Sequence, residues 1–213
     1  MDWCRRGRSF PAAFALGFLL LCAAAGSATA DEGLYGPAAP PGSAFVRVFN
    51  NTPHDLRDVR VGEKGLPEIQ PFGASEFVFL PPGSVTLTAG AAKQPLSLAK
   101  DTYHTAVVGG GEGVRVIDNG RWSSRLKSLV ILYNLLDGGP VDLRTADGKP
   151  VVDAVAPGAA AQREVNAVRV NLALFRDGKK VADVRPVNLE RGKSFSLFVT
   201  GSDAQPLPVW VVY

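Results

Sequence analysis

The chain has 213 residues, of which 23 are Lys or Arg and 20 are Asp or Glu, with two cysteines and two histidines. The first 30 residues hold three arginines and one aspartate, so residues 31–213 contain 20 cations and 19 carboxylates. This nearly even balance lacks the excess of basic residues that is typical of nucleic-acid-binding proteins. Cys4 and Cys22 both precede residue 31, so the rest of the chain can form no disulfide, thiolate metal site or cysteine nucleophile.

Residues 1–30 have the organisation of a secretory signal. Three arginines lie among the first eight residues, an apolar run covers residues 12–25, and Ala28 and Ala30 are the small residues that a signal peptidase reads. We therefore predict cleavage before Asp31 and a periplasmic location. No second long apolar segment follows, so no stable membrane insertion is expected.

Two other interpretations of this segment are less favoured. The apolar run is shorter than the ~20 residues that a membrane-spanning helix needs, which argues against an anchor. A lipoprotein signal has a small residue before its cysteine, whereas Leu21 precedes Cys22 here. The pair Arg5-Arg6 is a weak indication of a twin-arginine signal.

The segment after the predicted cleavage site is a candidate interaction element. Leu34 and Tyr35 are apolar anchors, and the prolines that follow them keep the chain extended. Such a segment could dock on a partner or cover an edge of its own sheet.

Alternating apolar and polar residues then predict an all-β fold. The pattern is clear over residues 85–89, 141–144 and 168–174, and Asp147-Gly148 and Asp177-Gly178 have the composition of two-residue hairpin turns. Short strands at this spacing are typical of β-sandwiches.

The second half of the chain resembles the first. Residues 44–50 and 129–134 are similar strands that end at Asn50 and Asn134, 84 residues apart, and each is followed by a Pro/Gly turn and a further alternating strand. We predict two tandem β-sandwich domains of similar topology, at residues 31–117 and 129–213, joined by a linker at 118–128. One larger sandwich is the alternative.

No residue set in the sequence indicates catalysis. A Gly-x-Ser-x-Gly turn is absent, and Ser75, Ser84 and Ser194 are expected in hairpin turns. His54 is expected in an exposed turn and His104 in a strand, too far apart in sequence for a recognisable zinc motif. We therefore predict no catalytic, cofactor-binding or metal-binding residues and no cofactor.

Two further segments contain residue types that are common in binding sites. The glycine-rich run at residues 109–113 precedes a strand-like segment, so it is expected to be a hairpin loop and not a phosphate cradle. Arg121, Trp122 and Arg125 at the predicted domain joint form a candidate site for an acidic polysaccharide, in which the indole stacks on a sugar ring. The alternative role for Trp122 is packing between the domains.

Several segments spread over residues 34–211 resemble the AlgF family of alginate biosynthesis (O-acetylation) proteins. The matching segments are residues 34–40, 42–47 with Asn50, 79–84, 145–149, 172–175, 199–202 and 208–211. The resemblance implies a periplasmic protein required for O-acetylation of alginate, a polymer of mannuronate and guluronate. The resemblance also implies that the catalytic serines belong to partner enzymes, so it transfers no active-site residues to this chain.

The sequence and the resemblance together favour a non-catalytic adaptor. Its expected partners are the periplasmic and membrane-associated alginate acetylation enzymes, with alginate itself as a further candidate and no nucleic acid. The alternatives are a carbohydrate-binding module for an acidic polysaccharide and an acetylesterase or acetyltransferase.

Overall fold

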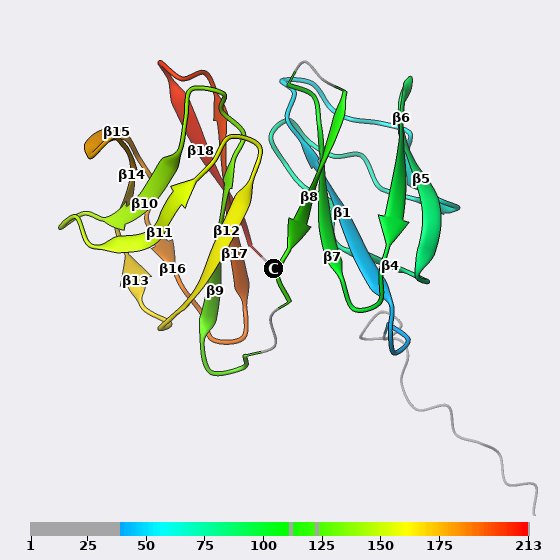
Figure 1. Cartoon of the computed structure of the whole chain (residues 1–213), viewed down its shortest axis with the longest axis horizontal. Coiled ribbons are helices and arrows are strands. Elements are labelled where there is room, and N and C mark those ends of the chain that lie inside the picture. The colour runs from blue at the N-terminus through cyan, green and yellow to red at the C-terminus, as the bar shows by residue number, and fades with distance from the viewer. Residues whose placement is uncertain (1–38, 111–112, 122–123, 213) are drawn as a thin grey trace, which may run out of the picture. The chain divides into compact units, whose positions relative to one another are not determined.

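Strands are the only regular elements in residues 39–110, 113–121 and 124–212, the part of the chain that the computed structural model describes (Figure 1). The first half contains β1 (Ala44–Asn50), β2 (Val59–Val61), β3 (Lys64–Gly65), β4 (Val78–Leu80), β5 (Gly83–Ala89), β6 (Ala92–Leu98), β7 (Tyr103–Val108) and β8 (Val114–Asn119). The second half contains β9 (Ser128–Asn134), β10 (Val141–Thr145), β11 (Pro150–Val155), β12 (Ala160–Val165), β13 (Arg169–Val170), β14 (Leu172–Arg176), β15 (Lys179–Asp183), β16 (Val187–Asn188), β17 (Ser194–Gly201) and β18 (Pro206–Val212).

Both halves have the same sheet topology. In the first, the sheets have the orders β4-β1-β7-β8 and β3-β2-β5-β6. The corresponding sheets of the second are β12-β9-β17-β18 and β11-β10-β14-β15, with the short pair β13-β16 added. In each half the first strand is parallel to a late one, β1 to β7 and β9 to β17, and the chain between them crosses through the other sheet. The prediction of two tandem β-sandwich domains of similar topology is confirmed.

Two buried asparagines occupy equivalent positions in the two domains. The Asn50 amide nitrogen donates to the carbonyl oxygens of His54 (2.7 Å), Ile69 (3.0 Å) and Gln70 (3.1 Å). The Asn134 amide nitrogen donates in the same way to Gly139 (3.0 Å) and Val155 (2.9 Å). Each side-chain oxygen also accepts from the backbone amide two residues later. The sequence repeat therefore includes an asparagine that, in each domain, holds neighbouring loops in place through hydrogen bonds to their backbone.

Each domain has its own hydrophobic core. In the first, aliphatic side chains from β1, β2, β5, β6 and β7 form one cluster that includes Val46, Val48 and Leu87. In the second, the cluster includes Val130, Leu132 and Leu197. Apolar burial of this kind is the main stabilising contribution expected in a domain without disulfides.

The hairpin turns follow the sequence prediction in one case and differ in the other. Asp177 and Gly178 have φ angles of 49° and 74° and close the β14–β15 hairpin as a two-residue turn. The expected two-residue turn at Asp147-Gly148 is wrong: only Gly148 has a positive φ, and the Thr145 amide pairs with the Lys149 carbonyl, which makes a three-residue loop. The hydrogen bond from the Thr145 hydroxyl, followed by the contact with Lys149, lowers the pKa of the Asp147 carboxyl in this loop.

Two other local expectations need correction. The alternating run at residues 168–174 is not one strand, because β13 pairs with β16 whereas β14 joins the sheet of β10 and β15. Val168 is therefore 52% exposed instead of facing a core. Ser84 and Ser194 lie in β5 and at the start of β17 and not in turns. The predicted domain limits remain predictions; β8 ends at Asn119 and β9 begins at Ser128.

Candidate functional site

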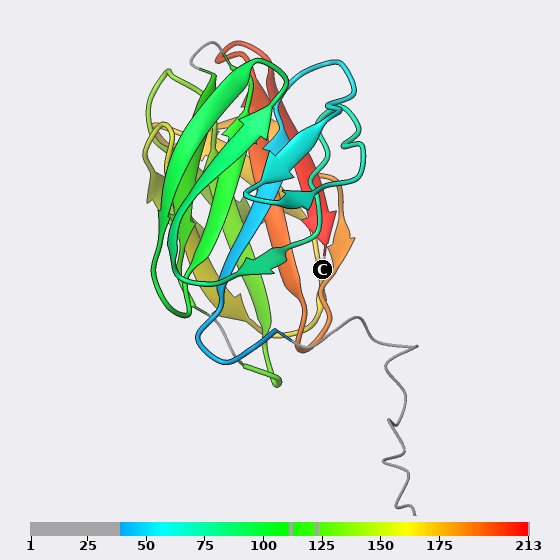
Figure 2. The same cartoon turned by 90° about the vertical axis from the view of Figure 1, so that its right-hand side faces the viewer.

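The central sheets of the two domains pack face to face (Figures 1 and 2). A fully buried arginine, Arg47, lies between them. Arg47 on β1 donates from Nε to the Thr105 hydroxyl of β7 (3.0 Å). Its Nη2 donates to the hydroxyls of Tyr133 on β9 (2.7 Å) and Ser196 on β17 (2.8 Å). One guanidinium thus hydrogen-bonds to both domains. We call this contact region the seam.

Aromatic rings surround the same guanidinium. The Arg47 Cζ atom lies 4.8 Å from the ring centroid of Phe77 and 5.4 Å from those of Tyr133 and Phe198. The Phe198 ring stacks between Phe49 (3.8 Å between centroids) and Tyr133 (4.3 Å). Cation–π contacts strengthen when water is excluded, so this packing favours the buried charge.

The alternation of β1 explains how the arginine reaches the seam. Val46 and Val48 point into the core of the first domain, which places Arg47 and Phe49 on the opposite face of the strand. The equivalent strand β9 is buried along its whole length, because Val130 and Leu132 face its own core and Ile131 and Tyr133 face the seam. Strands covered on both faces are near-continuously buried.

The sequence prediction missed this arrangement. An arginine between the aromatic residues Phe45 and Phe49 on one face of a strand was the available signal. It could not indicate the partner, since the acceptors Tyr133 and Ser196 are 86 and 149 residues away along the chain.

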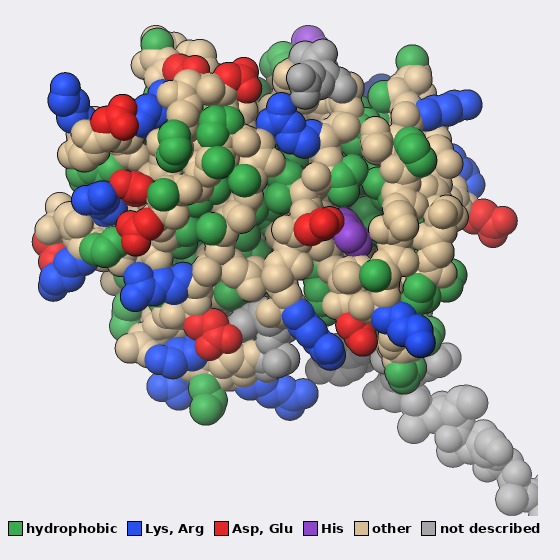
Figure 3. All heavy atoms as spheres, in the orientation of Figure 1, with side chains coloured by type: hydrophobic (Ala, Val, Ile, Leu, Met, Phe, Trp, Pro, Cys, Tyr) green, Lys and Arg blue, Asp and Glu red, His purple; other side chains and the backbone are tan. Residues whose placement is uncertain are grey.

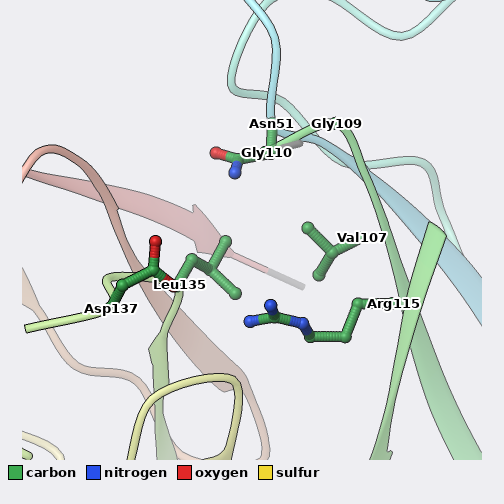
Figure 4. A pocket seen from close by; sticks show the side chains of 7 residues that line it. All are labelled: Asn51, Val107, Gly109, Gly110, Arg115, Leu135 and Asp137. Carbon is green, nitrogen blue, oxygen red and sulfur yellow. The ribbon is translucent and has the colours of Figure 1, made fainter. Parts of the chain in front are cut away.

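Two openings lie along the seam. The first is a cavity of about 20 Å³ bordered by residues of both domains, including Asn51, Val107, Arg115, Leu135 and Asp137 (Figure 4), and it has room for about one water molecule. The second is a hollow of about 170 Å³, which we call the aromatic hollow. It is lined by Phe77, Tyr103, Asn119, Gly120, Leu129, Ile131 and Ser194.

The aromatic hollow has pre-formed walls. Tyr103 stacks on Phe45 with 4.5 Å between ring centroids and meets Phe77 edge-on at 5.6 Å. Asn119, which also lines the hollow, donates a hydrogen bond to the Tyr133 hydroxyl of the Arg47 network. A recess lined mainly by aromatic and aliphatic side chains can accept an apolar side chain of another protein.

A second cluster brings a threonine, a histidine and an aspartate together. His104 and Asp118 are directly opposite each other on β7 and β8, and the imidazole Nδ1 lies 2.6 Å from Asp118 Oδ1. The Nε2 atom lies 2.8 Å from the Thr102 hydroxyl. A groove of about 280 Å³ runs beside the pair, bordered by β6 residues such as Gln94 and Ser97. The sequence prediction placed His104 in a strand correctly but missed the cross-strand carboxylate.

The hydrogen bonds of this cluster favour a structural role. The Thr102 hydroxyl donates to the Ala99 carbonyl oxygen at 2.7 Å, so its single proton is directed away from the imidazole. A nucleophilic hydroxyl would instead donate to the ring nitrogen that acts as its base. The arrangement holds the turn between β6 and β7 against β8.

The other predicted site residues are dispersed. Ala28, Ala30, Asp31, Leu34, Tyr35 and Trp122 lie outside the described residues. Arg121 and Arg125 are both exposed, and Arg121 Nη1 lies 3.9 Å from Asp101 Oδ2. His54 is in an exposed turn, and the glycines at 109, 110 and 113 flank a hairpin loop, as expected.

The described residues contain neither a metal-binding cluster nor a membrane-spanning helix. No group of three or more His, Cys, Asp or Glu side chains in residues 39–110, 113–121 and 124–212 could hold a metal ion. None of the described segments is a helix with the length and apolar character needed to cross a membrane.

Comparison with known proteins identifies relatives along nearly the whole chain. The family model described as alginate O-acetyl transferase AlgF matches residues 16–196. The alginate biosynthesis protein AlgF of Pseudomonas aeruginosa is 47% identical over 91% of this chain and 89% of its own length. Structures of the C-terminal and N-terminal domains of AlgF from P. aeruginosa are 48% and 41% identical to this chain. They cover 41% and 39% of it, at TM-scores of 0.38 and 0.35, and 99% and 100% of their own chains.

Proposed function

The chain belongs to the AlgF family, and from this premise we propose that it is a periplasmic, non-catalytic adaptor for O-acetylation of alginate. In this role it links the periplasmic and membrane-associated acetylation enzymes near the growing polymer. The family membership supports a role in alginate acetylation, and the described residues support the adaptor form of that role.

The observation that carries the proposal is the seam. The Arg47 hydrogen bonds and the stack of Phe49, Phe198 and Tyr133 hold the two domains as one body. A protein that binds two partners at once holds them at a defined distance only if its own domains are fixed relative to each other. Two domains on a flexible tether do not provide this. The outer faces of both central sheets are occupied by the seam, so partners must use other surfaces.

We place one such contact at the aromatic hollow. Aromatic residues in pre-formed recesses commonly anchor protein–protein interfaces, and a stable interface adds a rim that buries roughly 800 Å² on each partner. A surface loop of an acetyltransferase that inserts an apolar side chain between Phe77 and Tyr103 would satisfy this requirement.

A substitution at the rim of the hollow tests the adaptor function. Ser194→Arg puts a long charged side chain into the recess without removing a core group, and we expect about ten-fold weaker binding to a purified periplasmic acetyltransferase of the same pathway. Ser84→Arg, on an exposed position of β5, is the matched control and should bind like the wild type. Biolayer interferometry gives both affinities. Absence of binding between the wild type and every acetylation enzyme of the pathway would refute the adaptor role.

The placement of a hydroxyl, an imidazole and a carboxylate in the Thr102–His104–Asp118 cluster is the observation behind a second candidate, an acetyl transfer or acetylesterase activity. The direction of the Thr102 proton, toward the Ala99 carbonyl oxygen, is the observation against it. If the hydroxyl turned toward the imidazole on binding substrate, it could attack an acetyl ester.

A pair of variants separates the two functions. Under the adaptor proposal, His104→Gln lowers the free energy of unfolding by about 1 kcal/mol, since the buried His104 side chain loses its partly buried hydrogen bonds to Thr102 and Asp118, and it leaves alginate acetylation in cells unchanged. Thr102→Val retains the shape of the side chain and should also leave acetylation unchanged. Acetyl content of the secreted polymer and thermal denaturation of the purified variants are the measurements. Loss of acetylation in both folded variants would favour the catalytic function.

A further inference from the structure

One end of the second domain concentrates positive charge. It is formed by residues 124–128, 163–170 and 187–193, which we call the basic tip. Lys127 Nζ donates to Asn166 Oδ1 at 2.6 Å, and the Gly192 amide donates to the Lys127 carbonyl at 2.9 Å. The Leu189 amide donates to the Val168 carbonyl at 3.1 Å. These bonds hold the three segments side by side.

The charge of the basic tip contrasts with the remainder of the protein. The tip contains six cations, Arg125, Lys127, Arg163, Arg169, Arg191 and Lys193, against the two carboxylates Glu164 and Glu190. The rest of residues 31–213 holds 14 cations and 17 carboxylates. In Figure 3, Lys and Arg side chains gather at the lower end of the half that contains β9 and β17. Arg125, Arg169 and Arg191 form no ion pair with any described residue, so their charges face solvent.

Exposed aliphatic side chains accompany these cations. Leu126 is 75% exposed and lies between Arg125 and Lys127, and Val168 is 52% exposed and precedes Arg169. These are two of the four large apolar side chains that are exposed in the described part of the chain. Exposed aliphatic residues flanked by cations are suited to bind a lipid–water interface. The aliphatic groups insert at the boundary of the acyl chains, and the cations interact with the anionic headgroups.

We propose that the basic tip docks this protein peripherally on a bilayer that contains anionic phospholipid. The residue types of the described tip favour lipid over an anionic polysaccharide. Sugar rings stack on aromatic faces, and residues 124–128, 163–170 and 187–193 contain no aromatic residue, while Trp122, the stacking candidate beside Arg125, lies outside the described residues. Leu126 and Val168 supply aliphatic groups, which contribute to binding when they leave water for an acyl environment. The contact does not depend on the adaptor function.

Vesicle binding by the chain from Asp31 onward tests the proposal. This form omits the apolar run at residues 12–25, which would itself enter lipid, and retains the compact unit Ala39–Tyr213 with its hydrophobic cores. Co-sedimentation with phosphatidylcholine vesicles that contain about 30 mol% phosphatidylglycerol should show binding that about 0.5 M salt abolishes. Pure phosphatidylcholine vesicles should bind much less protein.

Variants locate the contact. The triple variant Arg125→Gln, Arg169→Gln and Arg191→Gln should bind on the order of 100-fold more weakly, at about five-fold for each lost cation. Lys93→Gln, Lys100→Gln and Lys179→Gln remove the same charge from exposed positions outside the tip and should change binding by less than about five-fold. Leu126→Ser should weaken binding about ten-fold, whereas Leu207→Ser on β18, where the side chain is 44% exposed, should not.

Three results would overturn the proposal. The first is equal binding to anionic and neutral vesicles. The second is equal loss of binding in the two triple variants, which would show an effect of net charge alone. The third is retention of the wild type by mannuronate oligomers, but not by anionic vesicles, at the same salt concentration, which would assign the tip to an anionic polysaccharide.

Discussion

Arg47→Met is expected to destabilise the protein by about 3 kcal/mol and to separate the unfolding of the two domains. Hydrogen bonds to charged groups contribute about 1.5–3 kcal/mol each, and the substitution removes donors from the hydroxyls of Thr105, Tyr133 and Ser196 inside the seam. For a protein of this size the loss corresponds to about 6–12 °C in Tm. Because each domain has its own core, differential scanning calorimetry should resolve two transitions.

Two further variants make this prediction decisive. Arg57→Met removes an arginine whose side chain is 68% exposed and pairs with Glu68, and it should change stability by less than about 1 kcal/mol. Ser196→Ala removes one acceptor of the Arg47 guanidinium and should give a smaller shift in the same direction. A single transition at the wild-type temperature in Arg47→Met would show that the guanidinium does not hold the domains together.

Asn50→Ala is expected to cost about 3 kcal/mol in the free energy of unfolding. The side chain donates to three carbonyl oxygens and accepts from the Thr52 amide, so its removal leaves several buried backbone groups without partners, at about 1–3 kcal/mol for each that water cannot reach. Asn134→Ala loses two carbonyl contacts instead of three and should cost somewhat less. Urea denaturation measures both values.

Hydrogen exchange distinguishes local stabilisation of the loops by Asn50 and Asn134 from an effect on the stability of the whole protein. In Asn50→Ala the backbone amides of residues 52–56 and 69–75 should exchange faster than those of the second domain, and Asn134→Ala should show the reverse. Asn171→Ala, at an exposed position between β13 and β14, is the control and should leave both patterns unchanged. Uniform acceleration over the chain in Asn50→Ala would contradict the assignment.

Local sequence patterns were sufficient to predict those structural features that depend on residues adjacent in the chain. Alternation at residues 85–89 predicts β5 because the side-chain period of a strand is two. Asp177-Gly178 predicts its turn because both positions need a positive φ. The similarity of the segments ending at Asn50 and Asn134 predicted the duplication. The break at Asn171 was missed because two strands in different sheets can continue one alternating pattern.

Residue order alone is therefore enough to predict the all-β class, the duplicated domain and the similarity to the AlgF family. Three-dimensional packing is needed to show that the outer faces of both central sheets bury each other around Arg47, and that His104 lies opposite Asp118. Alternation shows that the two faces of a strand differ, but it does not show what covers each face. That outcome depends on contacts between residues up to 149 positions apart, which no local period encodes.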